Sequence, residues 1–225
     1  FLPLSLAVYA LCRSLRAKNI SLLVFSLIFY AWGEPVYVLL LMAMALFDWY
    51  FALRVQRAQR EEKNAKLWVA LACVVNLGLI GFFKYAGMVC SIFGGVPAFV
   101  QRIALPLGIS FCTFHGISYL VDVYREPSRV CRRADTLFLY LAFFPRLIAG
   151  PIVRWQDAAA QLAEHPISPE MTAAGLRRLV RGLLKKLLLA ESAAAVANAV
   201  YALAPEQLGM GLAWLGAVSY CLQIF

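Results

Sequence analysis

Runs of apolar residues, separated by short polar or basic clusters, follow one another along the whole chain. A helix needs about 20 such residues to cross a bilayer, so the chain has room for about seven or eight spans. The Gly33-Glu34-Pro35 sequence predicts a tight turn between the second and third helices. The first helix is expected to end near Cys12, and the others to lie at 20–32, 36–53, 67–83, 104–123, 135–153, 191–203 and from 208 onward.

Glycine and proline residues mark two places where we expect the helical path to break. Gly94-Gly95 and Pro97 interrupt the segment 84–102, which is expected to lie on the outer side of the membrane, partly as a re-entrant segment. The sixth helix is expected to bend or break near Pro145 and Gly150-Pro151. Broken helices at membrane depth usually line a cavity, which suits a transporter or an enzyme equally.

The composition excludes several other classes of protein. Of the 225 residues, 63% are hydrophobic and 15% charged, against about 45–50% apolar and about 25% charged in soluble domains. These values exclude a soluble globule, a disordered chain, a coiled coil, collagen and a disulfide scaffold. The six cysteines stand singly, without metal-ligand spacing, and are expected to be buried small hydrophobic residues. The predicted fold class is therefore an all-α polytopic membrane protein.

The formal net charge of +9 reflects membrane topology rather than nucleic-acid binding. The 21 Lys and Arg residues fall mainly in blocks between apolar runs, where cytoplasmic loops concentrate positive charge. We therefore place the blocks on the cytoplasmic side and expect no nucleic-acid partner. The blocks span residues 13–18, 54–66, 125–133 and 177–186.

Residues 171–189 differ from the other segments because their pattern is amphipathic. At about 100° per residue, Arg177, Arg178, Arg181 and Lys185 share one third of the helical wheel, opposite a leucine-rich side. Lys186 belongs to the same basic block, but it departs from this division, as do Leu188 and Leu189. The pattern predicts a basic helix lying on the lipid bilayer surface. The alternative is a solvated face of a helix that packs on the protein.

Two histidines are the candidates for acid–base chemistry. His165 lies in a Glu164-His165-Pro166 loop and is interpreted as a surface residue. His115 lies within a predicted span, where an ionisable group is a functional candidate and a histidine can act as a general base. No acidic residue within one helical turn orients it, so a hydrogen-bonded packing histidine is the alternative. No metal site, phosphate loop or carboxylate cluster is predicted.

Three charged residues stand out within apolar segments. Asp48, beside Trp49 and Tyr50, is expected to reach the membrane interface. Asp122 is expected to pair with Arg125 or to cap neighbouring backbone. Arg146 needs water, a carboxylate or an anionic ligand, unless its side chain extends to the lipid headgroups.

Two long motifs resemble the membrane-bound O-acyltransferase (MBOAT) family, in the alginate O-acetyltransferase branch. The first runs from Leu105-Pro106-x-Gly108-Ile109-Ser110-Phe111 through Asp122-Val123-Tyr124-Arg125, and the second from Phe143-Phe144-Pro145 through Gly150-Pro151-Ile152-x-Arg154. Residues 30–35 and 182–186 match two shorter stretches. The motif residues expected at the site or its tunnel are Pro106, Gly108, Ser110, Phe111, Tyr119, Asp122, Tyr124, Arg125, Pro145, Arg146, Gly150, Pro151 and Arg154.

The resemblance implies a multi-helix bundle with a tunnel through a bacterial inner membrane. An acyl group from a cytoplasmic donor, acetyl-CoA or a carrier-bound acyl group, would pass toward an exported polysaccharide such as alginate, without a bound cofactor. Periplasmic modification proteins would be partners. Residues 1–225 would be the N-terminal part of one MBOAT domain.

The family's catalytic histidine lies in a later motif that this chain does not match. We therefore expect it beyond Phe225, expect the 225 residues alone to be inactive, and regard His115 as a weaker candidate within the first motif. Arg146 replaces the usual Gln and Cys112 a usual aromatic residue, so the exact subfamily stays open. D-alanyl transfer to teichoic acid, a transporter or flippase, and a scaffold without activity are the alternatives.

Overall fold

The computed structural model describes residues 1–225 except 96, 98–99, 101–104, 149, 165–167 and 225. The described residues form helices and connections and contain no strand, which confirms the all-α class. The chain divides into two compact units, residues 1–165 and 166–225.

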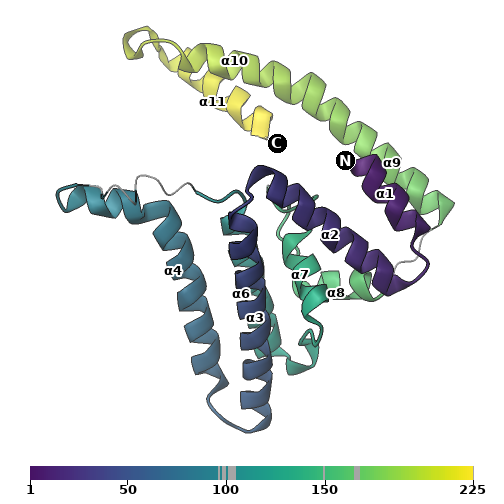
Figure 1. Cartoon of the computed structure of the whole chain (residues 1–225). Helices are drawn as coiled ribbons and strands as arrows, with labels where there is room; N and C mark the ends of the chain where they lie inside the picture. The colour runs from purple at the N-terminus through teal and green to yellow at the C-terminus, as the bar shows by residue number, and fades with distance from the viewer. Residues whose placement is uncertain (96, 98–99, 101–104, 149, 165–167, 225) are drawn as a thin grey trace. The chain divides into compact units, whose positions relative to one another are not determined.

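The first unit contains the longest apolar helices of the described chain (Figure 1). Its α-helices are α1 (Leu2–Leu11), α2 (Leu15–Gly33), α3 (Tyr37–Arg60), α4 (Ala65–Ile92), α6 (Ile109–Arg125), α7 (Ala134–Ala142) and α8 (Trp155–Ala163). Among the described helices, α2, α3 and α4 are long and apolar enough to cross a membrane. The chain is thus a membrane protein with several spans.

The helices α2 and α4 begin where polar side chains satisfy one of their first backbone N–H groups. Ser14 caps α2, because its hydroxyl accepts a hydrogen bond from the amide of Ala17 at 3.1 Å. The side-chain oxygen of Asn64 accepts from the amide of Leu67 at 3.2 Å and caps α4. Both capping residues lie in connections that also carry basic residues.

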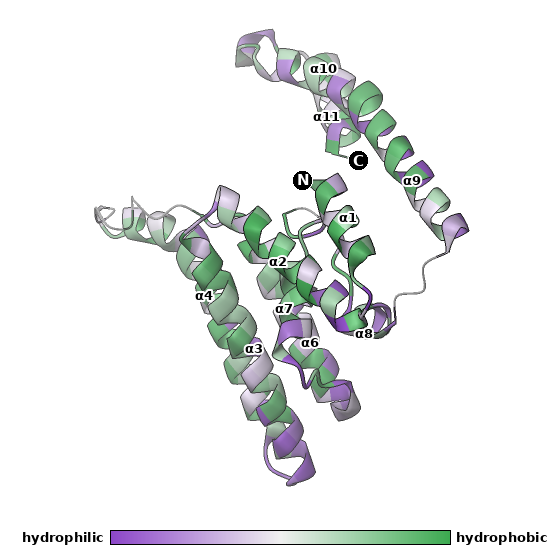
Figure 2. Cartoon of the chain, turned by 45° about the vertical axis from the view of Figure 1, so that its right-hand side comes forward, coloured by the Kyte–Doolittle hydropathy of each residue, from purple (hydrophilic) through white to green (hydrophobic). Residues whose placement is uncertain are grey.

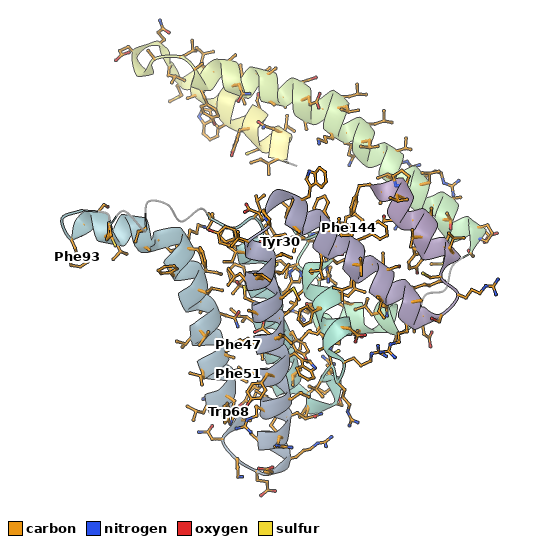
Figure 3. All side chains as sticks on the ribbon, viewed as in Figure 1. Tyr30, Phe47, Phe51, Trp68, Phe93 and Phe144 are labelled. Atoms are coloured by element: carbon orange, nitrogen blue, oxygen red, sulfur yellow. The ribbon has the colours of Figure 1, made fainter. Side chains whose placement is uncertain are left out.

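Small residues let α3, α4 and α6 approach one another closely. Ala52 and Ala72 are completely buried, and Ala45 is almost so, in the core that also holds Tyr119 and Leu120 of α6. Aromatic residues pack against the same core: Phe47 and Phe51 lie 4.3 Å apart by ring centroids, and Phe51 lies 5.9 Å from Trp68 of α4 (Figure 3). Both small and aromatic residues therefore pack between these helices.

The outer surfaces of the long helices are apolar. Figure 2 shows hydrophobic residues along the length of α2, α3 and α4, with hydrophilic ones gathered at the α3–α4 turn. Val74 and Leu39, for example, are 66% and 67% exposed. Lipid tails accept such side chains, whereas water would not, so these surfaces fit a bilayer environment.

The second unit consists of α9 (Pro169–Leu184), the π-helical segment η2 (Lys185–Ala190), α10 (Glu191–Tyr201) and α11 (Met210–Ile224). Gly216 of α11 lies against Val200 of α10, where an added Cβ would come within 2.8 Å of a valine methyl. Tyr201 and Tyr220 meet edge to face at 6.1 Å. The departure of Lys186, Leu188 and Leu189 from the amphipathic pattern is explained by η2, because a π-helix has a wider turn than an α-helix.

Several predicted boundaries agree with the structure, and others need correction. The turn at Gly33-Glu34-Pro35, the helix 171–189 and the last two helices are confirmed, as is the break at Gly94-Gly95, whose φ angles are 104° and 150°. The third and fourth helices were predicted too short, because α3 continues to Arg60 and α4 to Ile92. The fifth helix, expected at 104–123, begins later and ends later, because α6 runs from Ile109 to Arg125 and residues 105–108 are not helical; Ala104 itself lies outside the described residues.

The sixth helix was predicted at 135–153 with a bend or break near Pro145 and Gly150-Pro151, and a break there is confirmed. The second half of the range is wrong, because the described residues from 143 to 153 form no helix. The helix α7 ends at Ala142, before Pro145, and the separate helix α8 was not predicted. The expected burial of all cysteines is also wrong, because Cys221 is exposed and Cys12, Cys73 and Cys90 are only partly buried.

Candidate functional site at a break in the helical path

The connection between α7 and α8, residues 143–154, contains no regular helix among its described residues. It follows a helix that is buried along most of its length, since Leu137, Leu139 and Tyr140 are at most 1% exposed. Lipid cannot satisfy free backbone groups, so non-helical backbone at membrane depth must lie against protein or line a cavity. We call residues 143–154 the connecting segment.

Side chains of neighbouring helices satisfy the backbone of the connecting segment. The amide of Phe144 donates to the hydroxyl of Ser26 in α2 at 3.2 Å, and the hydroxyl of Tyr140 donates to the carbonyl of Val153 at 2.7 Å. The ring of Phe144 also contacts Phe29 of α2, with centroids 5.7 Å apart. These contacts hold the segment against α2 and α7.

Arg146 lies at the centre of the connecting segment. Its guanidinium is 4.7 Å from the ring centroid of Tyr140 and 5.9 Å from that of Phe143, and Nη2 donates to the carbonyl of Tyr140. Its Nε is buried without a hydrogen-bond partner among the described residues, and none of the described ion pairs includes Arg146. The guanidinium therefore turns inward over two rings, which contradicts extension to the headgroups and leaves part of its charge unpaired.

A cavity of about 470 Å³ opens beside Arg146. Apolar side chains from α1, α2 and α7, such as Leu6, Leu22 and Leu139, form most of its wall. Tyr9 and Gln161 add polar groups. A mostly apolar cavity with a few polar groups and one guanidinium has the character of a small-molecule site.

An aromatic cluster joins α6, α7 and α8 beneath this cavity. It consists of His115, Tyr119, Tyr140 and Trp155. The ring of Tyr140 lies 5.5 Å from His115 and 5.1 Å from Trp155, and Trp155 lies 5.3 Å from Tyr119, all edge to face. This cluster fixes the start of α8, so that the connecting segment is held at both ends.

His115 packs within this cluster. Its Nδ1 is 2.7 Å from the carbonyl oxygen of Phe111, and its ring is 3% exposed. Its Nε2 is buried and has no partner among the described residues. The interpretation of His115 as a hydrogen-bonded packing residue agrees with this geometry. Its Nε2 remains available for one further hydrogen bond. The prediction for His165 lies outside the described residues.

Asp48 and Asn76 form a second buried polar pair. The amide nitrogen of Asn76 donates to Oδ1 of Asp48 at 2.8 Å, and Asp48 is only 1% exposed. Oδ2 lies against Gly116 of α6, where an added Cβ would be 2.0 Å away. The expectation that Asp48 reaches the interface is therefore wrong, because the narrow α3–α6 contact encloses its carboxylate.

The residues of the first motif lie mostly in or beside the core. Tyr119 and Asp122 are buried, and the hydroxyl of Tyr119 accepts from the amide of Cys131 at 3.0 Å. No described ion pair joins Asp122 to Arg125, so that predicted pairing is not found. Arg125 is exposed at the end of α6. The other members are Pro106, which is buried, and Gly108, Ser110, Phe111 and Tyr124, which are half-buried.

The two motifs meet at Gly108. This residue has a φ of 72°, and an added Cβ would lie 2.5 Å from the carbonyl oxygen of Leu147. The second motif supplies Gly150, whose amide donates to the carbonyl of Arg146 at 3.0 Å. Its other predicted members, Pro145, Pro151 and Arg154, are exposed. The structure thus brings together Gly108, Arg146 and Gly150, and it leaves Arg125 and Arg154 outside.

Sequence reasoning missed Ser26, Tyr140 and Trp155 as parts of the site. Serine, tyrosine and tryptophan are ordinary residues in membrane helices, so no local signal distinguishes them. Asn76 gave a signal, because it is the strongly polar residue of an otherwise apolar span.

Comparison with known proteins identifies relatives that match the whole chain. A probable alginate O-acetylase from Azotobacter vinelandii is 36% identical over 100% of this chain and 46% of its own length. One from Pseudomonas aeruginosa is 35% identical over 100% of this chain and 44% of its own length. The chain is thus a relative of the alginate O-acetylases over its whole length, in agreement with the branch of the membrane-bound O-acyltransferases that its two motifs resemble.

A more distant relative carries a different substrate name. A peptidoglycan O-acetyltransferase from Helicobacter pylori is 29% identical over 100% of this chain and 49% of its own length. The chain spans about half the length of the relatives it matches. No family model matches the sequence, and no solved structure matches it.

Proposed function

We propose that this chain is part of a membrane O-acyltransferase that moves an acetyl group from a cytoplasmic donor to an exported polysaccharide of alginate type. The observation that carries the proposal is the 36% identity, over the entire chain, to a probable alginate O-acetylase. The mostly apolar cavity beside Arg146 supports it, because acyl transfer requires a site that limits the access of water to a reactive donor.

The chemistry needs a general base for the acceptor hydroxyl and positive charge near the reacting carbonyl. Arg146 supplies a guanidinium at the cavity wall and is the candidate group of this chain for binding an anionic part of donor or acceptor. In this proposal the donor is acetyl-CoA or a carrier-bound acyl group, and no cofactor is bound.

The proposal includes a location and partners. The protein resides in the bacterial inner membrane with its basic connections on the cytoplasmic side. The exposed side chains Arg177, Arg178, Arg181, Lys185 and Lys186 contact anionic lipid headgroups. Periplasmic polysaccharide-modification proteins receive or direct the acetyl group, and nucleic acid is not a partner.

Deleting the gene and analysing the exported polymers tests the function. We expect the acetyl content of the exopolysaccharide, measured by NMR, to fall to background while the amount of exported polymer stays unchanged. Lost export with normal acetylation of the remaining polymer would instead indicate a transporter. Because one relative is named a peptidoglycan O-acetyltransferase, peptidoglycan acetylation is measured in the same strains. A loss confined to peptidoglycan would replace the proposed acceptor.

A further inference from the structure

An apolar groove of about 640 Å³ follows α1 and α2, which lie side by side (Figure 1). Its wall includes Leu4 of α1 and Phe25, Ile28 and Phe29 of α2. Glu34 is the one charged side chain among its described lining residues, and we call it the Glu34 groove. Its volume lies within the range of about 300–1,000 Å³ that small-molecule sites occupy.

The Glu34 groove runs from a membrane surface into the apolar region. Glu34 lies in the turn between α2 and α3, and both helices are long and apolar enough to cross a membrane. Trp32, which is 91% exposed, lines the groove beside it, and tryptophan is enriched at membrane interfaces. From Phe25 to Glu34 the helical rise is about 14 Å, close to half of the roughly 30 Å apolar core. The groove therefore has the length of one lipid tail in one leaflet.

The surface end of the groove is suited to a positively charged group. The carboxylate of Glu34 is half-buried and takes part in none of the described ion pairs. The basic residues of α2, Arg16 and Lys18, lie at the opposite end of that helix. Since α2 ends at Gly33, the negative end of its dipole also lies beside Glu34. A cation that donates N–H bonds would satisfy this carboxylate.

The floor of the groove is formed by both motifs. Leu107 precedes Gly108 and Ile148 follows Leu147, so the two side chains flank the close backbone contact between the motifs. Leu107 is 47% exposed and Ile148 is 42% exposed. An occupant of the groove therefore contacts both motifs at once and covers apolar side chains that the described residues leave open.

We propose that the Glu34 groove binds phosphatidylethanolamine, with an acyl chain along Phe25, Ile28 and Phe29 and the headgroup ammonium on Glu34. The ammonium of this lipid donates N–H bonds, whereas the quaternary ammonium of phosphatidylcholine has none. Phosphatidylglycerol would bring a negative charge toward the carboxylate. The bound lipid covers Leu107 and Ile148 and so supports the contact between the motifs. Lipid binding needs no turnover, so its test is independent of the proposed acyl transfer.

Native mass spectrometry of the full-length protein in detergent tests the headgroup. The probes are phosphatidylethanolamine, phosphatidylcholine and phosphatidylglycerol with identical acyl chains. We expect wild-type protein to bind phosphatidylethanolamine at least about threefold more tightly than the other two, as one partly exposed ionic contact allows. Glu34→Gln should abolish this preference. Glu62→Gln, at an exposed acidic residue outside the groove, is the matched control and should retain it.

A second pair of variants tests the position of the acyl chain. Ile28 and Val24 are both on α2 and are 49% and 47% exposed, but Ile28 lines the groove and Val24 does not. Ile28→Trp fills the groove and should weaken binding of all three lipids about tenfold. Val24→Trp adds the same bulk to a neighbouring surface and should change the affinities less than about twofold.

Photo-crosslinking identifies the occupant in the membrane. Benzoylphenylalanine placed at Ile28 of the full-length protein should attach to a lipid when intact membranes are illuminated. Attachment to a protein segment, of this chain or of another, would overturn the proposal. It is also overturned if wild-type protein binds phosphatidylethanolamine and phosphatidylcholine equally, if Glu34→Gln keeps the preference, or if Ile28→Trp binds lipid normally.

Discussion

The guanidinium of Arg146 lies over the rings of Tyr140 and Phe143 and donates to a backbone carbonyl, yet no described carboxylate neutralises it. Burying a charge costs free energy, and replacing it with an apolar side chain of similar length is often neutral for stability. An arginine retained in such a place is therefore better explained by a ligand than by folding.

We expect Arg146→Met to separate these two roles. The thermal unfolding midpoint in detergent should stay within a few degrees of the wild-type value, because methionine preserves the packing on both rings while removing the charge. Polymer acetylation in cells should fall at least about tenfold, because the variant loses the charge-assisted hydrogen bond between the guanidinium and an anionic ligand. Arg154→Met, at the exposed last residue of the same segment, is the control and should retain acetylation.

Gly116 is the second residue whose identity the structure requires. An added Cβ would meet Oδ2 of Asp48 at 2.0 Å and would push apart the Asp48–Asn76 pair. We expect Gly116→Ala to destabilise the protein by about 1–3 kcal/mol through overpacking. Gly78→Ala, at a helical glycine with open space around its Cα, should be neutral or slightly stabilising. Thermal unfolding of both variants checks this, and equal midpoints would contradict the tight α3–α6 contact.

At the scale of elements, the connecting segment depends on bonds from its neighbours. Ser26 accepts from the amide of Phe144, and its hydroxyl also donates to the carbonyl of Leu22 in its own helix. We expect Ser26→Ala to cost about 1 kcal/mol of stability and to speed hydrogen exchange of residues 143–148. Ser21→Ala removes only a bond within α2, to the carbonyl of Lys18, and should leave that exchange unchanged.

The same dependence explains what the sequence could and could not predict about these elements. The long spans could be predicted, because about 20 apolar residues in lipid permit little besides a helix. A break near Pro145 could be predicted, because proline does not continue a helix. The end of α7 at Ala142 could not, because the hydroxyls of Ser26 and Tyr140 that hold the following segment come together only in the fold. The site was predictable to the extent that Arg146 is an isolated charge. Its partners Tyr140 and Trp155 required the fold.

At the scale of the whole molecule, hydrogen bonds place two basic connections at one end of the first unit. Gln56 and Gln59, near the end of α3, donate to the carbonyls of Pro127 and Tyr124 at 2.7 and 2.6 Å. The α3–α4 turn and the α6–α7 connection therefore lie on the same side of the membrane. By the positive-inside tendency, that side is cytoplasmic.

Single cysteines introduced into an otherwise cysteine-free protein test this topology. A membrane-impermeant maleimide added to intact cells should fail to label Lys63→Cys and Ser128→Cys, and should label both after permeabilisation. Pro35→Cys, in the exposed turn between α2 and α3, should be labelled in intact cells. Labelling of Lys63→Cys from outside would reverse the orientation, and opposite results at Lys63 and Ser128 would contradict the fold.

The close contact of Gly108 with the carbonyl of Leu147 has a consequence for how such chains vary. The two motifs are separate along the sequence but share one backbone contact, so neither can change length or bulk there alone. We expect natural variants that replace Gly108 to carry a compensating rearrangement around Leu147, and insertions in one motif to be matched in the other. The two motifs are therefore expected to change together during evolution.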